Sequence, residues 1–150
     1  LIKDVGANAK MNEFQAAMGL CNLRHIDREL AKRKAVVEHY NERLSGVNGL
    51  KISAPQKDVK PNYAYYPVIF EPEEFGKSRD EIYELLKVNE IYARKYCYPL
   101  TNTFECYKGM FDMGDTPVAL DLSKKVLTLP LYADLRIDQV DRICDIILGR

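Results

Sequence analysis

The sequence has few of the residues from which most nucleophilic and metal sites are built. Of its 150 residues only two are histidine and four are cysteine. The cysteines form no Cys-x-x-Cys pair, which argues against a zinc ribbon and against a disulfide-rich secreted scaffold. We expect free, buried thiols in a reducing compartment, and a cytoplasmic protein. His25 and His39 lie in a charged helical segment, and no spacing brings either near a cysteine, so a Cys–His dyad is not expected.

An excess of charge of one sign is also missing. Lysine plus arginine and aspartate plus glutamate both number 22, so the formal net charge is zero. A balanced chain gives no electrostatic reason to bind nucleic acid. The apolar runs are far too short for a membrane span, and no Gly-rich phosphate loop of the common kinds occurs. We therefore expect neither a nucleic-acid partner nor a membrane partner.

Helical and strand patterns alternate along the chain. Asn12 with Gln15 is a capping box, and the apolar spacing that follows predicts one or two helices from about 12 to 45. Ser78 opens a second capping box, which predicts a helix to about 89. Alternation, β-branching and turn signals predict the remaining elements: strands at 50–53, 63–70, 91–93 and 126–129, and helices at 116–125 and 137–147.

This order of elements predicts an α/β or α+β fold in which helices pack on a small sheet. Pro67 lies inside the strand expected at 63–70, which favours an edge strand or a bulge. The first helical segment is long enough to run off the compact core. The segment 96–115 is rich in aromatics and turn formers, and we expect it to be irregular.

Many of the ten tyrosines lie in the middle of the chain. Packing in the core and against the sheet is the favoured interpretation, and a platform for stacking or for a sugar is the alternative. The stretch that is richest in them contains Tyr63, Tyr65, Tyr66, Tyr92, Tyr96, Tyr98 and Tyr107. Residues 6–10 precede a helix and would cap it, with anion binding as the alternative. No cluster of acid, base and nucleophile emerges, so the residues alone predict no self-sufficient active site.

Three stretches carry a family resemblance. Residues 6–20 read GANAKMNEFQAAMGL, residues 62–68 read NYAYYPV ahead of Arg94 and Tyr96, and residues 127–135 read LTLPLYADL. In this order they resemble the DegT/DnrJ/EryC1/StrS aminotransferases. The first is similar to the family stretch G-x-N-x-(R/K)-M-x-(D/E)-x-Q-A-A-x-G-L, and the third to its closing L-x-L-P-x-Y-x-x-L. The resemblance covers essentially the whole chain.

The resemblance implies the fold of aspartate aminotransferase, the type I fold of pyridoxal-phosphate enzymes, and within it the small C-terminal domain. Residues 1–45 would form the linking loop and the interdomain and dimer helices, and residues 46–150 the small α/β domain. In the family the Schiff-base lysine and the carboxylate that pairs with the pyridine nitrogen lie upstream. The chain is therefore expected to be a C-terminal fragment of a homodimeric enzyme and inactive by itself.

The resemblance also implies a reaction. The full-length enzyme of which this chain would be a part, here called the parent, would use pyridoxal 5′-phosphate to move an amino group from glutamate to a nucleotide-linked keto-sugar, in amino-sugar biosynthesis. Asn8 matches the family asparagine that reaches the cofactor phosphate of the neighbouring subunit, and Lys10, Arg94 and Tyr96 fall in substrate-binding positions. No residue is expected to be catalytic or to bind a metal.

Two alternatives remain open. One is a dehydratase of the same family, which uses the same cofactor without the lysine. The other is a stand-alone α/β interaction module. An orphaned domain should expose apolar residues such as Phe14, Met18 and Leu20, whereas a stand-alone module should carry polar residues there.

Overall fold

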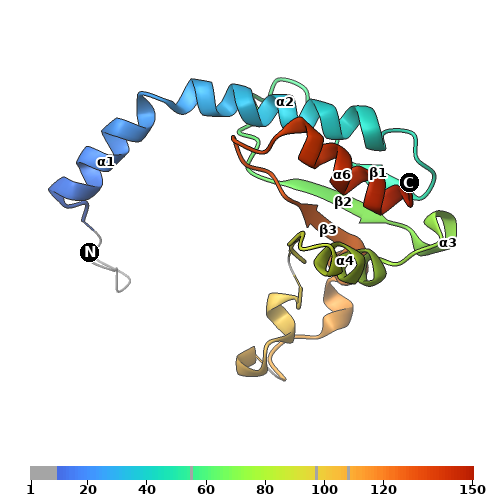
Figure 1. Cartoon of the computed structure of the whole chain (residues 1–150). Helices are drawn as coiled ribbons and strands as arrows, with labels where there is room; N and C mark the ends of the chain where they lie inside the picture. Colours follow the sequence, from blue (N-terminus) through green and yellow to red (C-terminus); the bar gives the residue numbers. More distant parts are fainter. Residues whose placement is uncertain (1–9, 55, 97, 108) are drawn as a thin grey trace.

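A computed structural model describes residues 10–54, 56–96, 98–107 and 109–150. Figure 1 shows a small sheet covered by helices, with one helix standing away from this body. The elements follow in the order α1 (Glu13–Leu23), α2 (Ile26–Leu44), β1 (Leu50–Ile52), β2 (Tyr66–Phe70), α3 (Pro72–Phe75), α4 (Arg79–Val88), α5 (Pro117–Lys125), β3 (Val126–Leu129) and α6 (Ile137–Leu148). Three single 3₁₀ turns lie between α4 and α5. The expected mixed α/β class is confirmed.

The sheet is antiparallel with the strand order β1-β2-β3, so β2 is the central strand. The edge position expected from Pro67 is therefore wrong. The register explains why proline is tolerated, because β1 pairs with β2 only as far as Val68. Pro67 pairs with Thr128 of β3 alone. No residue of β1 lies opposite Pro67 on its other side, so the missing N–H of the proline leaves no carbonyl of β1 without a donor.

The strand expected at 91–93 does not form. One residue later, Arg94 makes a single antiparallel bridge with Thr128 on the free side of β3. The short helix α3 was not expected from the sequence. It begins at Pro72, which suits the first helical turn, and it is capped by Gly76, whose φ of 85° favours glycine.

Helices α2 and α6 pack against each other, and α4 contacts both α6 and β3. Their apolar faces meet the sheet in one core, and each fully buried aliphatic or aromatic side chain stabilises it by about 1.5–3 kcal/mol. The aromatic centre of this core is Tyr40, which stacks on Tyr66 with ring centroids 4.7 Å apart. The buried apolar residues come from nearly every element of the body: Val36, Tyr40, Leu44, Tyr66, Val68, Phe70, Ile82, Leu86, Ala93, Leu127, Leu129, Leu135, Val140, Ile143, Cys144 and Ile147.

A polar cluster joins α2 to α6 at the surface. His39 Nε2 lies 2.8 Å from Asp141 Oδ1. Arg43 donates to Asp141 and, at 2.5 Å, to Asp145. The hydrogen bond from His39, followed by that from Arg43, lowers the pKa of Asp141 below its ordinary value. His39 belongs to this cluster, and His25 is the residue before α2.

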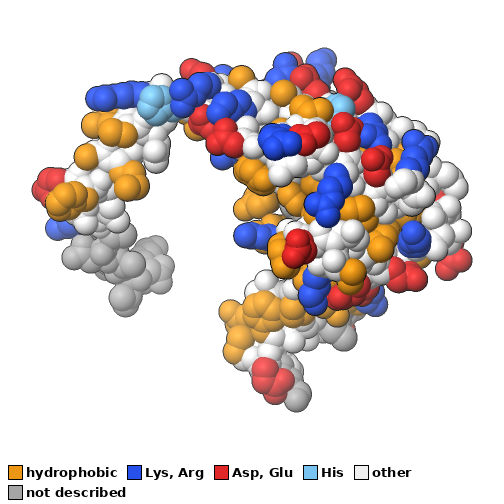
Figure 2. Space-filling model, in the orientation of Figure 1, with side chains coloured by type: hydrophobic (Ala, Val, Ile, Leu, Met, Phe, Trp, Pro, Cys, Tyr) orange, Lys and Arg blue, Asp and Glu red, His pale blue; other side chains and the backbone are white. Residues whose placement is uncertain are grey.

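The helix α1 leaves the body. Its capping box forms as expected, with Gln15 N–H donating to Asn12 and Asn12 N–H donating to Gln15. The helix buries no residue of its own, and Phe14 is 87% exposed. Figure 2 shows apolar side chains along it, facing solvent. The exposed apolar surface expected of an orphaned domain is present.

The irregular segment after α4 also projects from the body (Figure 1). The buried guanidinium of Arg79 anchors its base by donating to the carbonyl oxygens of Ser123 and Val126, and it lies 5.1 Å from the Tyr98 ring centroid. In the described part of the chain, no helix is long and apolar enough to cross a membrane.

Candidate functional site

A cavity of about 320 Å³ opens beside the last strand of the sheet. Its walls come from three separate parts of the chain, which the fold brings together. The lining residues are Ala64, Tyr65, Tyr92, Arg94, Tyr96, Thr128, Leu129, Pro130, Leu131 and Tyr132. Two of the three family-like stretches thus meet here, one at residues 64–65 and the other at residues 128–132.

The backbone of β3 positions Arg94. Its N–H donates to the carbonyl oxygen of Thr128 at 2.9 Å, and the N–H of Thr128 donates back to Arg94 at 2.8 Å. Thr128 is itself buried at 7% exposure. A reciprocal pair of hydrogen bonds to a buried strand fixes where this arginine leaves the sheet, although its side chain is exposed.

The side chain of Arg94 is held by Tyr96, which in turn packs against Tyr65. Its Nη1 donates a hydrogen bond of 2.7 Å to the Tyr96 hydroxyl, and its Cζ lies 5.9 Å from the Tyr96 ring centroid. The Tyr65 ring meets the Tyr96 ring edge-on, at 5.2 Å between centroids. Because the Tyr96 hydroxyl accepts from it, the pKa of Arg94 is raised above its ordinary value. The guanidinium is permanently charged.

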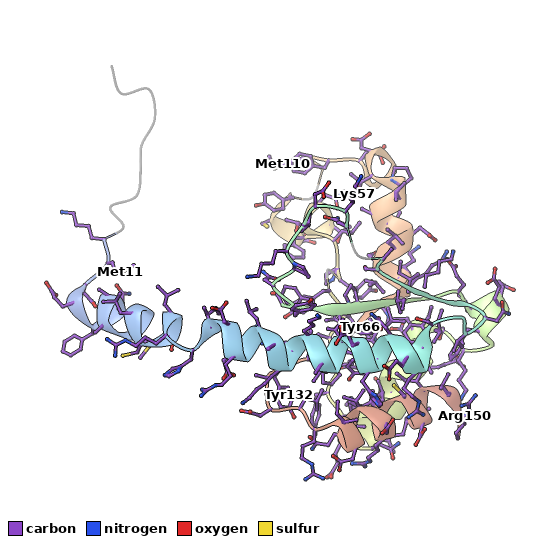
Figure 3. The ribbon with its side chains drawn as sticks, turned by 90° about the horizontal axis from the view of Figure 1, so that it is seen from above. Met11, Lys57, Tyr66, Met110, Tyr132 and Arg150 are labelled. Atoms are coloured by element: carbon purple, nitrogen blue, oxygen red, sulfur yellow. The ribbon has the colours of Figure 1, made fainter. Side chains whose placement is uncertain are left out.

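The opposite wall is rigid. The carbonyl oxygen of Pro130 accepts a hydrogen bond of 3.0 Å from the buried hydroxyl of Tyr40. Leu129 before it is a core residue at 2% exposure, while Tyr132 after it is 48% exposed. In Figure 3 Tyr132 lies beside α2, on the side where α6 is drawn. One side of the cavity is therefore anchored in the core and the other side is open to a ligand.

This arrangement suits an anion attached to an apolar ring. Among the described residues that line the cavity there is no carboxylate and no lysine, so Arg94 supplies the charge. No acidic side chain in the described part of the chain pairs with it. A planar guanidinium with free N–H donors matches phosphate or carboxylate oxygens. Tyrosine rings present apolar faces with polar edges, as a sugar requires.

The expected substrate residues are only partly brought together. Arg94 and Tyr96 are direct partners in the cavity. Lys10 is exposed and immediately precedes Met11, which Figure 3 places at the far end of α1 from Tyr132. Within one chain Lys10 therefore does not join the cavity. Asn8 lies outside the described residues.

Some tyrosines pack in the core and others line the cavity, so each of the two interpretations made from the sequence, core packing and a platform for a sugar, fits some of them. Tyr66 is buried in the core, as the favoured interpretation holds, while Tyr65, Tyr92 and Tyr96 line the cavity. Sequence reasoning did not assign Tyr132 to the site. The signal was present, because Tyr132 is the tyrosine of the closing L-x-L-P-x-Y-x-x-L stretch.

A second, larger hollow of about 830 Å³ lies between α2 and the loop from Ser53 to Pro67. We call it the loop groove. The α2 side contributes Lys34, Val37, Glu38 and Asn41. Ala64 and Tyr65 line both the cavity and the loop groove, so these two residues form the wall between them.

Comparisons with known proteins agree with this geometry. The sequence profile of the DegT/DnrJ/EryC1/StrS aminotransferase family matches residues 2–148 of this chain. A dTDP-4-amino-4,6-dideoxy-D-glucose transaminase of Escherichia coli is 39% identical over 147 residues, which cover 97% of this chain and 39% of the relative. The enzyme of the same name from Shigella dysenteriae is 35% identical over 142 residues, covering 95% of this chain and 38% of the relative.

Among solved structures, that of DesI in the presence of its TDP-sugar product matches with a TM-score of 0.86 and 28% identity. The match covers 96% of this chain and 36% of that one. The expected placement of the fold among pyridoxal-phosphate aminotransferases is therefore confirmed. The chain spans about 39% of the length of the first curated relative that it matches.

Proposed function

This chain belongs to the DegT/DnrJ/EryC1/StrS aminotransferase family, and we propose that it is the C-terminal part of a pyridoxal-phosphate-dependent transaminase of nucleotide-linked keto-sugars. The observation that carries the proposal is the Arg94 guanidinium, held by Tyr96 in a tyrosine-walled cavity. Relatives that cover nearly all of this chain are named as transaminases of a dTDP-linked amino sugar. These names favour a transaminase over the dehydratase of the same family.

The described residues do not by themselves fit pyridoxal phosphate. The cavity has an anion-binding arginine but no lysine to act as the nucleophile. Two lysines line the loop groove. Lys34 is ion-paired with Glu38 at 3.5 Å and more than half exposed, and Lys60 is also exposed. A solvated ammonium is a poor nucleophile. We therefore derive no step through the cofactor. We propose that the Schiff-base lysine lies in the rest of the complete enzyme and that this chain contributes residues that bind the substrate.

Arg94 would bind the diphosphate of the substrate. Its N–H groups form charge-assisted hydrogen bonds with phosphate oxygens, and a tyrosine hydroxyl is its single side-chain partner among the described residues. Tyr65 and Tyr92 would pack against the sugar or exclude water from it. Asn8 and Lys10 would act in the neighbouring subunit's site, since Lys10 lies away from the cavity of its own chain.

The exposure of α1 supports the proposal that this chain is part of a larger enzyme and not a stand-alone module. This helix is rich in apolar residues and buries none of them, although such side chains are normally covered by protein. Phe14, Met18 and Leu23 are all more than 60% exposed. We propose that the segment 1–45 links the body, residues 46–150, to the rest of the parent and to its dimer partner.

The test is an amino-transfer assay. The complete protein that contains this chain should transfer nitrogen from glutamate to a dTDP-linked 4-keto-sugar, and the 150-residue chain alone should not. Loss of a substrate hydroxyl without amination would instead identify the dehydratase. Transamination by the isolated chain would contradict the proposal that the Schiff-base lysine lies outside it.

A further inference from the structure

We propose that the loop groove binds the nucleoside end of the nucleotide sugar, while the adjoining cavity takes its phosphates and sugar. The inference rests on the proposed function, and it adds a second ligand compartment to the same site. It starts from the shared wall, because Ala64 and Tyr65 line both hollows. The two hollows are therefore adjacent, and a ligand that extends from Arg94 across Tyr65 would occupy both.

The loop groove has the size and lining of a small-molecule site. Its volume of about 830 Å³ lies within the range of about 300–1,000 Å³ that is usual for ligand pockets. The lining mixes apolar side chains such as Val37 and Val59 with three aromatic rings, Tyr63, Tyr65 and the buried Tyr66. A nucleobase presents a flat π-face, and aromatic rings stack on any base.

Two amides of the loop groove are oriented by internal hydrogen bonds. The Oδ1 of Asn41 accepts from the Tyr66 hydroxyl at 2.8 Å, and the Oδ1 of Asn62 accepts from the N–H of Ala64 at 3.1 Å. In each amide the oxygen already accepts a hydrogen bond, and the NH₂ group is available to donate one to a ligand. In the part of the chain that the structure describes, neither NH₂ group has a hydrogen-bond partner. The pair selects a ligand with acceptor oxygens, such as the carbonyl groups of a base.

Backbone strain and charge support the same assignment. Tyr63 has a φ of 49°, an uncommon conformation for an aromatic residue, and strained residues collect at binding sites. Lys60 and Lys34 line the loop groove together with Glu38, so its charge balance is positive. An anionic nucleotide is thus attracted to the loop groove as well as to Arg94.

The test is a titration of the 150-residue chain followed by NMR, with the side-chain NH₂ signals of Asn41 and Asn62 as reporters. Thymidine diphosphate should shift both NH₂ signals and the Arg94 Nε–H signal. Inorganic pyrophosphate should shift the Arg94 signal and leave both amides in place, because it has no nucleoside.

The matched variants are Asn41→Asp and Asn62→Asp. Each aspartate keeps the oxygen that accepts from Tyr66 or Ala64, but it replaces the NH₂ donor with a negative charge. Together they should weaken thymidine diphosphate binding by about tenfold or more, since at least two hydrogen bonds are lost. Asn22→Asp makes the same chemical change on α1 and should leave binding unchanged, and circular dichroism confirms that each variant is folded.

The outcomes separate the two proposals. If thymidine diphosphate shifts Arg94 but neither amide, the loop groove inference is wrong and the cavity stands. If it shifts the amides but not Arg94, the loop groove is supported and the phosphate role of Arg94 is contradicted. Absence of any shift at the amides, or unchanged affinity in the double variant, overturns the inference.

Discussion

The hydroxyl of Tyr40 on α2 donates a hydrogen bond of 3.0 Å to the carbonyl oxygen of Pro130, so the core holds the wall of the candidate site directly. Tyr40 is fully buried and stacks on Tyr66. Burial raises the pKa of the Tyr40 hydroxyl well above its ordinary value, so it remains a neutral donor at any physiological pH. One tyrosine thus connects the long helix, the central strand and the cavity.

Replacing Tyr40 with phenylalanine should destabilise the chain while keeping its packing. The variant leaves the Pro130 carbonyl without its donor, which costs about 1–2 kcal/mol and lowers Tm by about 2–8 °C. Tyr92→Phe is the control, because Tyr92 is 73% exposed and surface changes stay within about 0.5 kcal/mol. Equal melting temperatures for the two variants, measured by calorimetry, would show that the Tyr40 bond contributes nothing.

The cluster between α2 and α6 predicts a dependence of stability on acid. The pKa of Asp141 is lowered in the fold, chiefly by His39 and then by Arg43. The stability that this depression contributes is present above the ordinary aspartate pKa of about 3.9, and it is lost as pH falls through the lower folded value. Asp141→Asn should therefore flatten the loss of stability below about pH 4 in urea titrations. An unchanged pH dependence, equal to that of Asp121→Asn on α5, would contradict this.

The thiols should differ sharply in reactivity. Burial raises the pKa of Cys144 to about 12, and its side chain lies in the core. Cys21 is exposed on α1 and Cys106 is exposed as well, so the expectation of buried thiols is wrong for these two and confirmed for Cys144. In variants that retain one of these cysteines, a disulfide reagent at neutral pH should label Cys144 at least about a hundredfold more slowly than Cys21. Comparable rates would mean that α6 opens readily from the sheet.

The exposed face of α1 should make the isolated chain associate. Phe14 is 87% and Met18 68% exposed, and apolar patches of this kind drive association. We expect a dimer or larger species by light scattering, and a monomer when both residues become glutamate. Val88 and Val118, at 81% and 71% exposure, provide the control pair. If the unaltered chain is a monomer, α1 is not an interface.

Local features were readable from the sequence, because local chemistry determines them. The capping boxes at Asn12 and Ser78 form as expected, and the helix expected at 137–147 forms as α6, with Val140 and Ile147 buried in the core. Ile137 is 43% exposed because it is the first residue of that helix.

Tertiary pairing was harder to predict. Ile91 and its neighbours have strand-like residues, but β3 meets this segment only at Arg94, so no strand forms. Likewise, no local pattern shows that Tyr65 and Tyr132 will share a cavity, because their proximity depends on the order of strands in the sheet. The buried arginine, Arg79, also reads as a surface charge until its carbonyl partners are known.

The kinetics of an Arg94→Gln variant of the complete protein test the central claim most directly. Loss of a charged hydrogen-bond donor to the diphosphate should raise KM for the nucleotide sugar about tenfold to a hundredfold, with kcat little changed. Arg142→Gln removes a guanidinium on α6 and should leave KM unaltered. A KM for Arg94→Gln equal to that of the unaltered enzyme would show that the tyrosine-walled cavity does not bind the substrate.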